Sequence, residues 1–311
     1  MSSRNYTHIS IGNFNLDIAL YINSIPPPGS STLVKDFDIR PGGAATNYAV
    51  AVARYGHSAY LVASTSNYPI VKSALQSLKE LGVDTTYVKE VNQPPGSVVI
   101  LILPEGERTM LKYPGSNEFI QSSDVPEHLM ARAHVIHMAS VKPDLVSGIA
   151  RIARRKGVVI TYDPGVYAES LGGKAGDILR DVDILFTNES EFKLLTREIR
   201  AENFFKFGLS ILVVKMGSRG AFVRLPSGIC YHGSAHPIRK PVDSTGAGDA
   251  FDAFFNSKYL ESKDPGVALM YAVAAGALKI GCRGSFLCWD PRLFEAQLEK
   301  AIVEQGVDKC P

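Results

Sequence analysis

The chain alternates between short apolar runs and segments with helical spacing, and this alternation limits the possible folds more than any other feature. Runs rich in β-branched residues predict strands at Ser58–Ser64, His134–Ala139, Val158–Tyr162, Asp183–Thr187 and Ser210–Lys215. Helices are expected at Ala45–Tyr55, Ile70–Leu81, Asp144–Lys156, Glu189–Thr196, Gly246–Leu260, Pro265–Ile280 and Pro291–Glu304. Strands and helices in this order predict an α/β fold, in which helices cover both faces of a doubly wound, mainly parallel sheet.

Two pairs of predicted strands have no helix between them. Leu16–Ile22 and Thr32–Ile39 are joined by a turn-rich run of prolines, and Ser97–Leu103 and Arg108–Tyr113 flank Pro104–Glu107. We expect both pairs to form a small β-sheet that projects from the core as a lid, built from segments at about residues 16–40 and 96–114. An antiparallel extension of the main sheet is the alternative. The rest of residues 1–311 is expected to form a single core.

Charge and cysteine content restrict the class of protein. The 33 basic and 31 acidic residues leave a net charge of +2, without a basic stripe for nucleic acid. No signal peptide and no apolar run long enough to span a membrane is visible, so we expect a cytoplasmic protein without a membrane partner. The four cysteines form no C-x-x-C pair, and we expect four reduced thiols, as is usual in the cytosol.

The strongest local motif is the run from Asp243 to Asp249, Asp-Ser-Thr-Gly-Ala-Gly-Asp, which opens a predicted helix. Free N–H groups at a helix start, aided by the helix dipole, can bind an anion such as phosphate. Asp249 lies in the first turn, where it could accept a proton from a hydroxyl that attacks phosphorus. The alternative is that Asp249 only complements the helix dipole.

Three more motifs contain polar groups next to glycines or at strand ends. Pro41-Gly42-Gly43 leads to Asn47, which could bind sugar hydroxyls or simply cap a helix. Asn188 and Glu191 directly follow a buried strand and could hold Mg²⁺ through its waters, or form a helix N-cap. The run from Lys215 to Gly220 also follows a strand and could lie along phosphates, or turn into the next strand. No P-loop, nucleophile elbow or H-E-x-x-H motif is present, and no G-x-G-x-x-G follows the first strand, which excludes a Rossmann-type dehydrogenase.

Taken together and in this order, the four motifs resemble those of the ribokinase-like (PfkB-type) carbohydrate kinase family. The resemblance extends from the first strand to about Ser285 and rests on G-G-x-x-x-N, N-x-x-E and D-S-T-G-A-G-D. It implies the ribokinase-like fold with its β-sheet lid, through which some members dimerise. It also implies phosphoryl transfer from ATP with Mg²⁺.

The resemblance assigns roles residue by residue. Asp249 matches the catalytic base, and Gly246, Ala247 and Gly248 match the anion hole. The matching positions of the sugar site are Asn13, Asp17, Gly42, Gly43 and Asn47. Asn188 and Glu191 match the pair that positions Mg²⁺ and the triphosphate, and the ATP phosphate loop is matched by Lys215, Gly217 and Gly220. Asp243 and Thr245, with the loop around Arg283–Ser285, lie where many members hold K⁺.

The acceptor is left open by these motifs. Ser64–Pro69 lacks the glycine and acidic residues that sugar kinases of the family usually carry there, and Tyr162–Gly165 and Gly284–Asp290 are similar to archaeal-type nucleoside kinases. The resemblance therefore favours a ribosyl nucleoside, whose base Phe14, Tyr113 and Phe119 could stack. The alternatives are a kinase for free ribose, a hexose or a 2-keto-3-deoxy sugar acid, and a catalytically silent binding protein.

Overall fold

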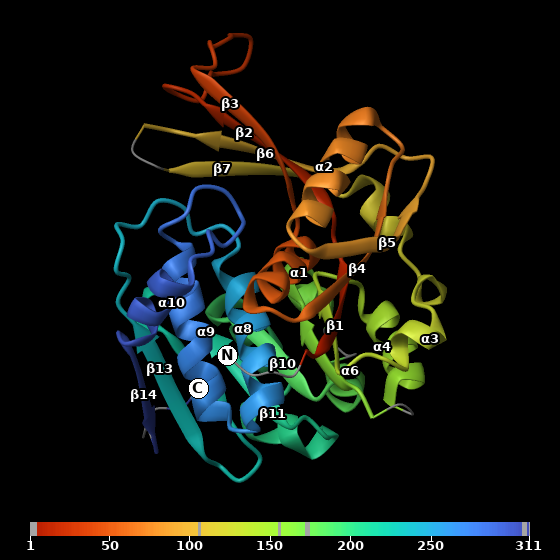
Figure 1. Cartoon of the computed structure of the whole chain (residues 1–311), viewed down its shortest axis with the longest axis vertical. Helices are drawn as coiled ribbons and strands as arrows, with labels where there is room; N and C mark the ends of the chain where they lie inside the picture. The colour runs from red at the N-terminus through yellow and green to blue at the C-terminus, as the bar shows by residue number, and fades with distance from the viewer. Residues whose placement is uncertain (1–4, 105–106, 155–156, 172–174, 307–309, 311) are drawn as a thin grey trace.

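A large mixed sheet forms the centre of the computed structural model, which describes residues 5–104, 107–154, 157–171, 175–306 and 310 (Figure 1). Within these residues the sheet has ten strands in the order β14-β13-β12-β11-β10-β9-β8-β1-β4-β5. The seven strands from β11 to β5 run parallel, and β12, β13 and β14 add antiparallel pairs at one edge. The predicted α/β fold with a mainly parallel sheet is confirmed.

The strands of the large sheet have short, largely buried central segments. Their bounds are β1 Thr7–Gly12, β4 Ser58–Thr65, β5 Val83–Glu90, β8 Val135–Ala139, β9 Val159–Asp163, β10 Ile184–Asn188, β11 Ile211–Lys215, β12 Ala221–Arg224, β13 Cys230–Ala235 and β14 Ala301–Gln305. The parallel strands read as continuous apolar runs because both of their faces are covered.

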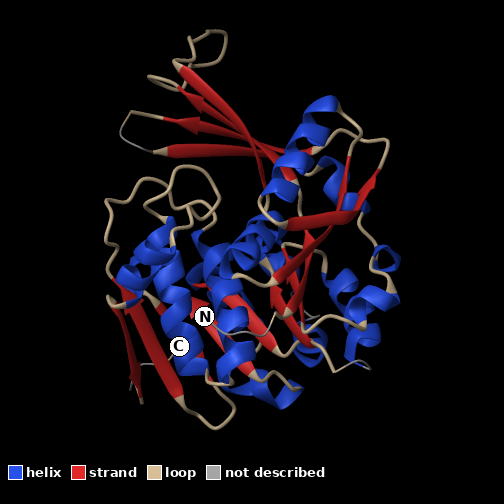
Figure 2. Ribbon diagram, in the orientation of Figure 1, coloured by secondary structure: helices blue, strands red, loops and turns tan. Residues whose placement is uncertain are grey.

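Helices cover both faces of this sheet (Figure 2). Their bounds are α1 Ala44–Tyr55, α2 Pro69–Glu80, α3 Glu127–Met130, α4 Pro143–Ala153, α5 Ala168–Leu171, α6 Ala175–Asp181, α7 Glu189–Glu198, α8 Ala247–Ser262, α9 Pro265–Lys279 and α10 Pro291–Leu298. One apolar cluster packs α4, α6 and α7 against the strands, and two others contain α1, α8 and α9. The expected end of one helix, Lys156, lies outside the described residues.

A second, separate sheet projects from the core and stands at the top of Figures 1 and 2. Its strand order is β3-β2-β6-β7, with bounds β2 Asn15–Tyr21, β3 Asp36–Gly42, β6 Gly96–Ile102 and β7 Arg108–Tyr113. We call it the small sheet. It is not an extension of the main sheet, so that alternative is wrong. Strand β1 of the main sheet ends at Gly12, and strand β2 of the small sheet begins three residues later at Asn15.

Two predicted elements differ from the structure. Thr32–Lys35 is not part of β3, which begins at Asp36 and runs on to Gly42. The helix expected over Pro291–Glu304 ends at Leu298, and Ala301–Gln305 forms β14, which pairs with β13. The β-branched Ile302 and Val303 favour a strand, and the free edge of β13 supplies its partner.

The prediction of four reduced thiols is wrong. Cys230 is bonded to Cys310, and Cys282 is bonded to Cys288. The first pair is separated by 80 positions, so the sequence gives no sign of it. In the fold, Gly306, just after β14, donates a backbone hydrogen bond to the carbonyl of Cys230 and so places the end of the chain near that residue. The cytoplasmic location rested partly on reduced thiols and stays a prediction. Among the described residues, no helix has the length and apolar character needed to cross a bilayer.

Candidate active site

The start of α8 is built by close backbone packing around Gly246. This residue has φ 78°, which favours glycine, and a Cβ there would lie 2.0 Å from the carbonyl oxygen of Ser285. The next turn contains Gly248, whose position faces the ammonium of Lys215 at 3.4 Å from an added Cβ. The predicted anion hole at Gly246–Gly248 therefore combines free helix N–H groups with a nearby cation, an arrangement suited to phosphate.

Asp249 lies in the first turn of α8 and is bonded to the glycine motif of α1. Asn47 donates a hydrogen bond from Nδ2 to Oδ2 of Asp249 at 2.7 Å. Burial of the carboxyl raises the pKa of Asp249 to about 6, although Asn47 and Lys215 oppose the shift. A carboxylate with a pKa near neutrality is well suited to accept a proton.

Asp17 and the glycine pair form the opposite wall of the same site. Gly42 has no side chain because Oδ2 of Asp17 would lie 2.0 Å from its Cβ, and a Cβ on Gly43 would lie 2.4 Å from the carbonyl of Asn13. Burial and the nearby charge of Asp249 raise the pKa of Asp17 to about 7. The structure thus brings together the predicted sugar-site residues and the proposed base, although they come from β2, the start of α1 and α8.

Lys215 turns into the core from the end of β11. Its ammonium lies 2.7 Å from Asp163 Oδ2 and 3.0 Å from both carboxylate oxygens of Asp252. Burial alone would raise the pKa of Asp163, but the Lys215 charge outweighs it and the net shift is downward. Lys215 is therefore held beside the anion hole by two carboxylates that sequence reasoning did not place in the site.

The glycines that follow Lys215 make the turn from β11 to β12. Gly217 has φ 60° and Gly220 has φ 87°, and a Cβ on Gly220 would lie 1.9 Å from the carbonyl of Gly233. This geometry is the alternative that the sequence left open for the run. A role of the same loop along phosphates stays a prediction.

Asn188 and Glu191 form a capping box at the start of α7. Glu191 N–H donates to Asn188 Oδ1 at 2.9 Å, and the Glu191 carboxylate accepts from Asn188 N–H at 2.8 Å and Nδ2 at 2.7 Å. Burial, followed by the charge of Asp163, raises the pKa of Glu191 to about 7. Two carboxylates whose charges disfavour each other fit a divalent cation, which would relieve the repulsion, so the residues present fit Mg²⁺ bound largely through water and phosphate.

Three arginines that come from distant segments line one cavity between the small sheet and the core. They are Arg40 on β3, Arg108 on β7 and Arg283 in the loop after α9. Asp17 lines the same cavity, which therefore continues from the sugar site. Sequence reasoning did not identify Arg40 and Arg108 as site residues, because only the pairing of the small sheet orients them toward Asp17.

The residues predicted to hold K⁺ are already bonded to cationic groups. Asp243 Oδ1 accepts from Arg108 and from Thr245 N–H, and its main-chain carbonyl accepts from Lys279 Nζ at 2.7 Å. Thr245 Oγ1 also accepts from Arg108, at 2.7 Å. A further cation about 4 Å from each of these charges would be repelled by about 4 kcal/mol per pair near a protein surface. These residues do not fit a K⁺ ion.

A comparison with family models identifies the family of this chain. Residues 7–292 match the model of the pfkB family carbohydrate kinases. The chain belongs to the PfkB family of carbohydrate kinases. As a PfkB kinase it is a phosphotransferase that acts on a sugar or a nucleoside, and its transferase chemistry agrees with the motif analysis.

Curated relatives and solved structures agree with this membership. The PfkB chain is 32% identical over 279 residues to an ATP-dependent ribose-1-phosphate kinase of Halopiger xanaduensis, covering 89% of this chain and 93% of the relative. It is 26% identical over 296 residues to ribokinase of Arabidopsis thaliana, covering 89% of this chain and 76% of the relative.

The fold matches those of solved family structures. Arabidopsis ribokinase, solved with ribose and ATP, superposes with a TM-score of 0.81 at 24% identity, covering 95% of this chain and 99% of that one. A putative ribokinase II of E. coli, solved with ATP and Mg²⁺, gives 0.82 at 22% identity, with 94% and 99% covered. The nucleoside kinase of Methanocaldococcus jannaschii gives 0.83 at 18% identity, with 96% and 100% covered.

Proposed function

We propose that this chain transfers the γ-phosphoryl of ATP to a primary hydroxyl of a ribose unit that already carries a phosphate, as ribose-1-phosphate does. The observation that supports this acceptor is the convergence of Arg40 and Arg283 on the cavity next to Asp17. Guanidinium groups bind phosphate through paired hydrogen bonds, whereas a neutral sugar or nucleoside would leave both cations without a substrate partner. Arg108 lines the same cavity but is bonded to Asp243, Thr245 and Ser244.

Two of the arginines are held by weak contacts, which include a 3.4 Å hydrogen bond from Arg40 to the main-chain carbonyl of Arg283. Arg40 pairs with Asp38 on its own strand at 2.5 Å, and Arg283 lies 3.4 Å from Asp36 and stacks on the ring of Tyr21. Exposed ion pairs of this kind contribute about 0–1 kcal/mol, so either guanidinium can turn to a phosphate at little cost. The name of the Halopiger relative supports the same acceptor.

The nucleoside that the resemblance favoured receives less support. Of the aromatic residues considered for stacking a base, Phe14 is fully buried in the core. Tyr113 lies on the face of β7 opposite Arg108, because the two are five residues apart on a strand. A nucleoside therefore remains an alternative acceptor, together with free ribose, a hexose and a 2-keto-3-deoxy sugar acid.

In the proposed reaction the acceptor hydroxyl lies between Asp249 and the start of α8. Asp249 takes the hydroxyl proton as the oxygen attacks the γ-phosphorus, and the N–H groups of Gly246, Ala247 and Gly248 stabilise the charge on the transferred phosphoryl. Asn47 and Asp17 orient the sugar. Closure of the small sheet as a lid would keep water from the phosphoryl group.

ATP is proposed to lie along the ends of β10 and β11. Asn188 and Glu191 would hold Mg²⁺, which supplies charge neutralisation of the triphosphate when bound. Lys215 would contribute a fixed positive charge beside the γ-phosphoryl, while Gly217 and Gly220 would let the phosphates approach the backbone.

The test measures ADP release from ATP and Mg²⁺ with ribose-1-phosphate, ribose, common nucleosides, a hexose and a 2-keto-3-deoxy sugar acid. We expect the highest kcat/KM with ribose-1-phosphate. In Arg40→Ala and Arg283→Ala the KM for this acceptor should rise about ten-fold, as for a lost charged hydrogen bond, while the KM for ATP stays the same. Arg292→Ala on the exposed start of α10 is the matched control.

Other outcomes of the panel would contradict the proposal. Preference for a nucleoside or a free sugar would overturn the phosphorylated acceptor, and an increase in the KM for ATP alone would assign the arginines to the donor. Binding of ligands without ADP release would favour the silent binding protein.

We further propose that the small sheet pairs with that of a second copy. Side chains alternate across a strand, so the face opposite the arginines carries a different set. Register places Ile39, Ile18, Val99 and Leu111 in one row across the four strands, and Phe37, Leu20 and Leu101 in the next. Phe37 is 64% and Leu111 60% exposed, and an uncovered apolar face of this kind marks an interface.

Light scattering on a sizing column tests this pairing. We expect a dimer for the unmodified chain and a monomer for Leu111→Lys, with Arg292→Ala remaining dimeric. A monomeric unmodified chain at micromolar concentration would contradict the interface.

A further inference from the structure

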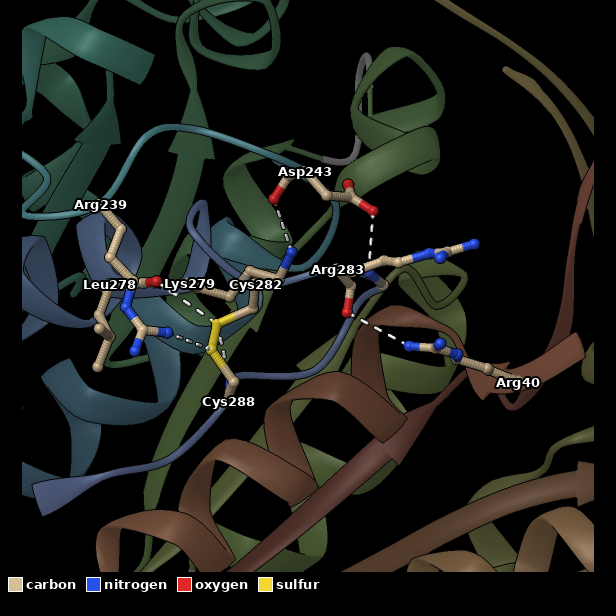
Figure 3. The surroundings of a disulfide bond; sticks show 9 residues. Arg40, Arg239, Asp243, Leu278, Lys279, Cys282, Arg283 and Cys288 are labelled. Atoms are coloured by element: carbon tan, nitrogen blue, oxygen red, sulfur yellow. Dashed lines mark hydrogen bonds between the residues drawn. A yellow bond between two sulfur atoms is a disulfide. The ribbon is translucent and has the colours of Figure 1, made fainter. Parts of the chain in front are cut away.

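Asp243 is the point at which four separate parts of the chain are tied together. Its carboxylate accepts from Arg108 of the small sheet, from Thr245 N–H before α8, and at 3.1 Å from Gly284 N–H in the loop after α9. Its carbonyl accepts from Lys279 at the end of α9 (Figure 3). Each oxygen of Asp243 is therefore engaged by an N–H donor.

Two of these four donors carry a positive charge. Lys279 is completely buried, and the Arg108 side chain is 22% exposed. Arg108 also donates to Thr245 Oγ1 at 2.7 Å and to Ser244 Oγ at 2.9 Å, so it contacts three successive residues of the motif. The two cations thus contact Asp243 and Thr245, the residues that the family resemblance assigned to K⁺.

The same bonds fix the geometry of the anion hole. Gly284 is bonded to Asp243, and its neighbour Ser285 places its carbonyl directly against Gly246, where a Cβ would approach to 2.0 Å. Loss of charge at Asp243 would release both the segment that leads into α8 and the loop that packs on it. A cation at this point therefore positions the N–H groups of Gly246–Gly248.

We propose that Lys279 and Arg108 act as positioning residues that replace a monovalent cation, so that the kinase works without K⁺. Lys279 supplies one charge from the core, and Arg108 supplies a second one when the small sheet lies against the core. Burial lowers the pKa of Lys279 to about 8, although the charge of Asp243 opposes the shift, so the tests are made at pH 7 or below. The inference rests on the proposed kinase function for its activity readout, but its binding readout does not.

The first test uses the unmodified protein in potassium chloride and in tetramethylammonium chloride of equal ionic strength. The melting temperature should be the same in both salts, and kcat should agree within about two-fold. Stabilisation by K⁺, or activation by K⁺ of about ten-fold or more, would overturn the inference. If no acceptor in the panel is phosphorylated, the proposed function fails while the comparison of melting temperatures still decides this one.

The second test removes the charge of Lys279, so that an added monovalent cation should take its place. Lys279→Met keeps the chain length and removes the charge, which leaves the Asp243 carbonyl buried without its donor. We expect kcat to fall about ten-fold or more in tetramethylammonium chloride, KM for both substrates to change little, and K⁺ or ammonium to restore part of kcat and to raise the melting temperature. Lys300→Met, an exposed lysine after α10, is the control and should show no salt effect.

A variant on the small sheet provides a second test that does not depend on the folding of Lys279→Met. If Lys279→Met does not fold, Arg108→Met is measured in the same way, and Arg108→Lys should recover most of the lost kcat because it keeps the charge. Unchanged kcat in tetramethylammonium chloride for the folded variant, or an equal loss in Arg108→Lys and Arg108→Met, would overturn the inference.

Discussion

Asn47 Nδ2 donates a 2.7 Å hydrogen bond to Oδ2 of Asp249, although 202 residues separate them in the chain. Asn47 is 6% exposed, and its other polar atom, Oδ1, is buried and has no hydrogen-bond partner within the described residues. A buried acceptor without a donor is costly unless a ligand supplies one. Asn47 can therefore hold the proposed base and accept a hydrogen bond from a sugar hydroxyl at the same time.

The pH dependence of kcat/KM should report Asp249. Because burial raises its pKa to about 6, the free enzyme should lose activity as the pH falls below about 6 and reach a plateau above it. Asn47→Leu removes a hydrogen bond that stabilises the charged form, so the acid limb should move up by about one pH unit. A pH profile with a saturating nucleotide concentration measures the shift.

Thr46→Val serves as the control for that profile. Thr46 is a buried neighbour whose hydroxyl donates to the carbonyl of Asn13 and does not contact Asp249 in the structure. The acid limb of the pH profile of Thr46→Val should stay near pH 6. An Asn47→Leu profile that coincides with that of the unmodified enzyme would contradict the role of the hydrogen bond.

Asp249→Asn should separate catalysis from folding. It removes the proposed base while keeping the shape of the side chain, so kcat should fall by about 10² or more. The acceptor should still raise the melting temperature, because Asp17 and Asn47 remain to bind it. Turnover close to normal would mean that another group takes the proton, and loss of the thermal shift would mean that Asp249 mainly binds the acceptor.

Asp17→Asn should stabilise the protein at alkaline pH. Folding raises the pKa of Asp17 from 3.8 to about 7, so the folded state holds the proton more tightly than the unfolded state. The free energy of unfolding therefore falls as the pH rises through this window, and the full cost is present above about pH 7. Asn has no such cost, and we expect a higher melting temperature at pH 8 together with a kcat/KM lower by about 10-fold to 10²-fold.

Measurements at acidic pH provide the internal control for Asp17→Asn. Near pH 4 the folded state is protonated at Asp17 and the unfolded state is roughly half protonated, so most of the cost is gone and the two melting temperatures should differ far less than at pH 8. A stabilisation of equal size at pH 4 and pH 8 would point to packing instead of ionisation.

Removal of the two disulfides should have different effects on stability and on kcat. Cys230–Cys310 spans 80 positions of sequence and Cys282–Cys288 spans 6. Chain-entropy arguments assign about 4.5 kcal/mol to the long loop and about 2.4 kcal/mol to the short one. Cys230→Ser with Cys310→Ser should therefore cost more stability in a denaturant titration, whereas Cys282→Ser with Cys288→Ser should cost more kcat, because the short loop contains Gly284 and Ser285.

The opposite ranking would contradict that assignment. If the pair at residues 230 and 310 lowers kcat more than the pair at 282 and 288, the short loop does not depend on its disulfide for the position of Ser285. The two double variants act as controls for each other, since each removes two cysteines and one disulfide.

Local chemistry could be predicted where the signal is contiguous in sequence. The start of α8, with Gly246 and Asp249, follows from glycine turn geometry and helix-terminus electrostatics, and the capping box at Asn188 follows from its spacing to Glu191. The helical expectation failed at Ala301–Gln305 because a strand there depends on the free edge of β13, which no local pattern reveals.

Contacts between distant segments could not be predicted. Arg108 and Asp243 are 135 positions apart, and only the pairing of β6 with β7 turns Arg108 toward the core. Lys279 lies in an apolar helix, where the sequence marks it as an interruption and gives no hint of its partner. The acceptor site depends on such contacts, which is why the motifs identify the transferred group more readily than the molecule that receives it.

The two faces of the small sheet carry different kinds of side chain, and successive residues of each strand lie on opposite faces. In β2, Asp17 and Tyr21 line the cavity, whereas Ile18 and Leu20 lie in the apolar rows on the other side. Insertion or deletion of a single residue at the start of this strand would exchange the faces. The proposed acceptor binding and the proposed pairing with a second copy would then be lost in one step, so length changes in β2 should be tolerated far less than substitutions.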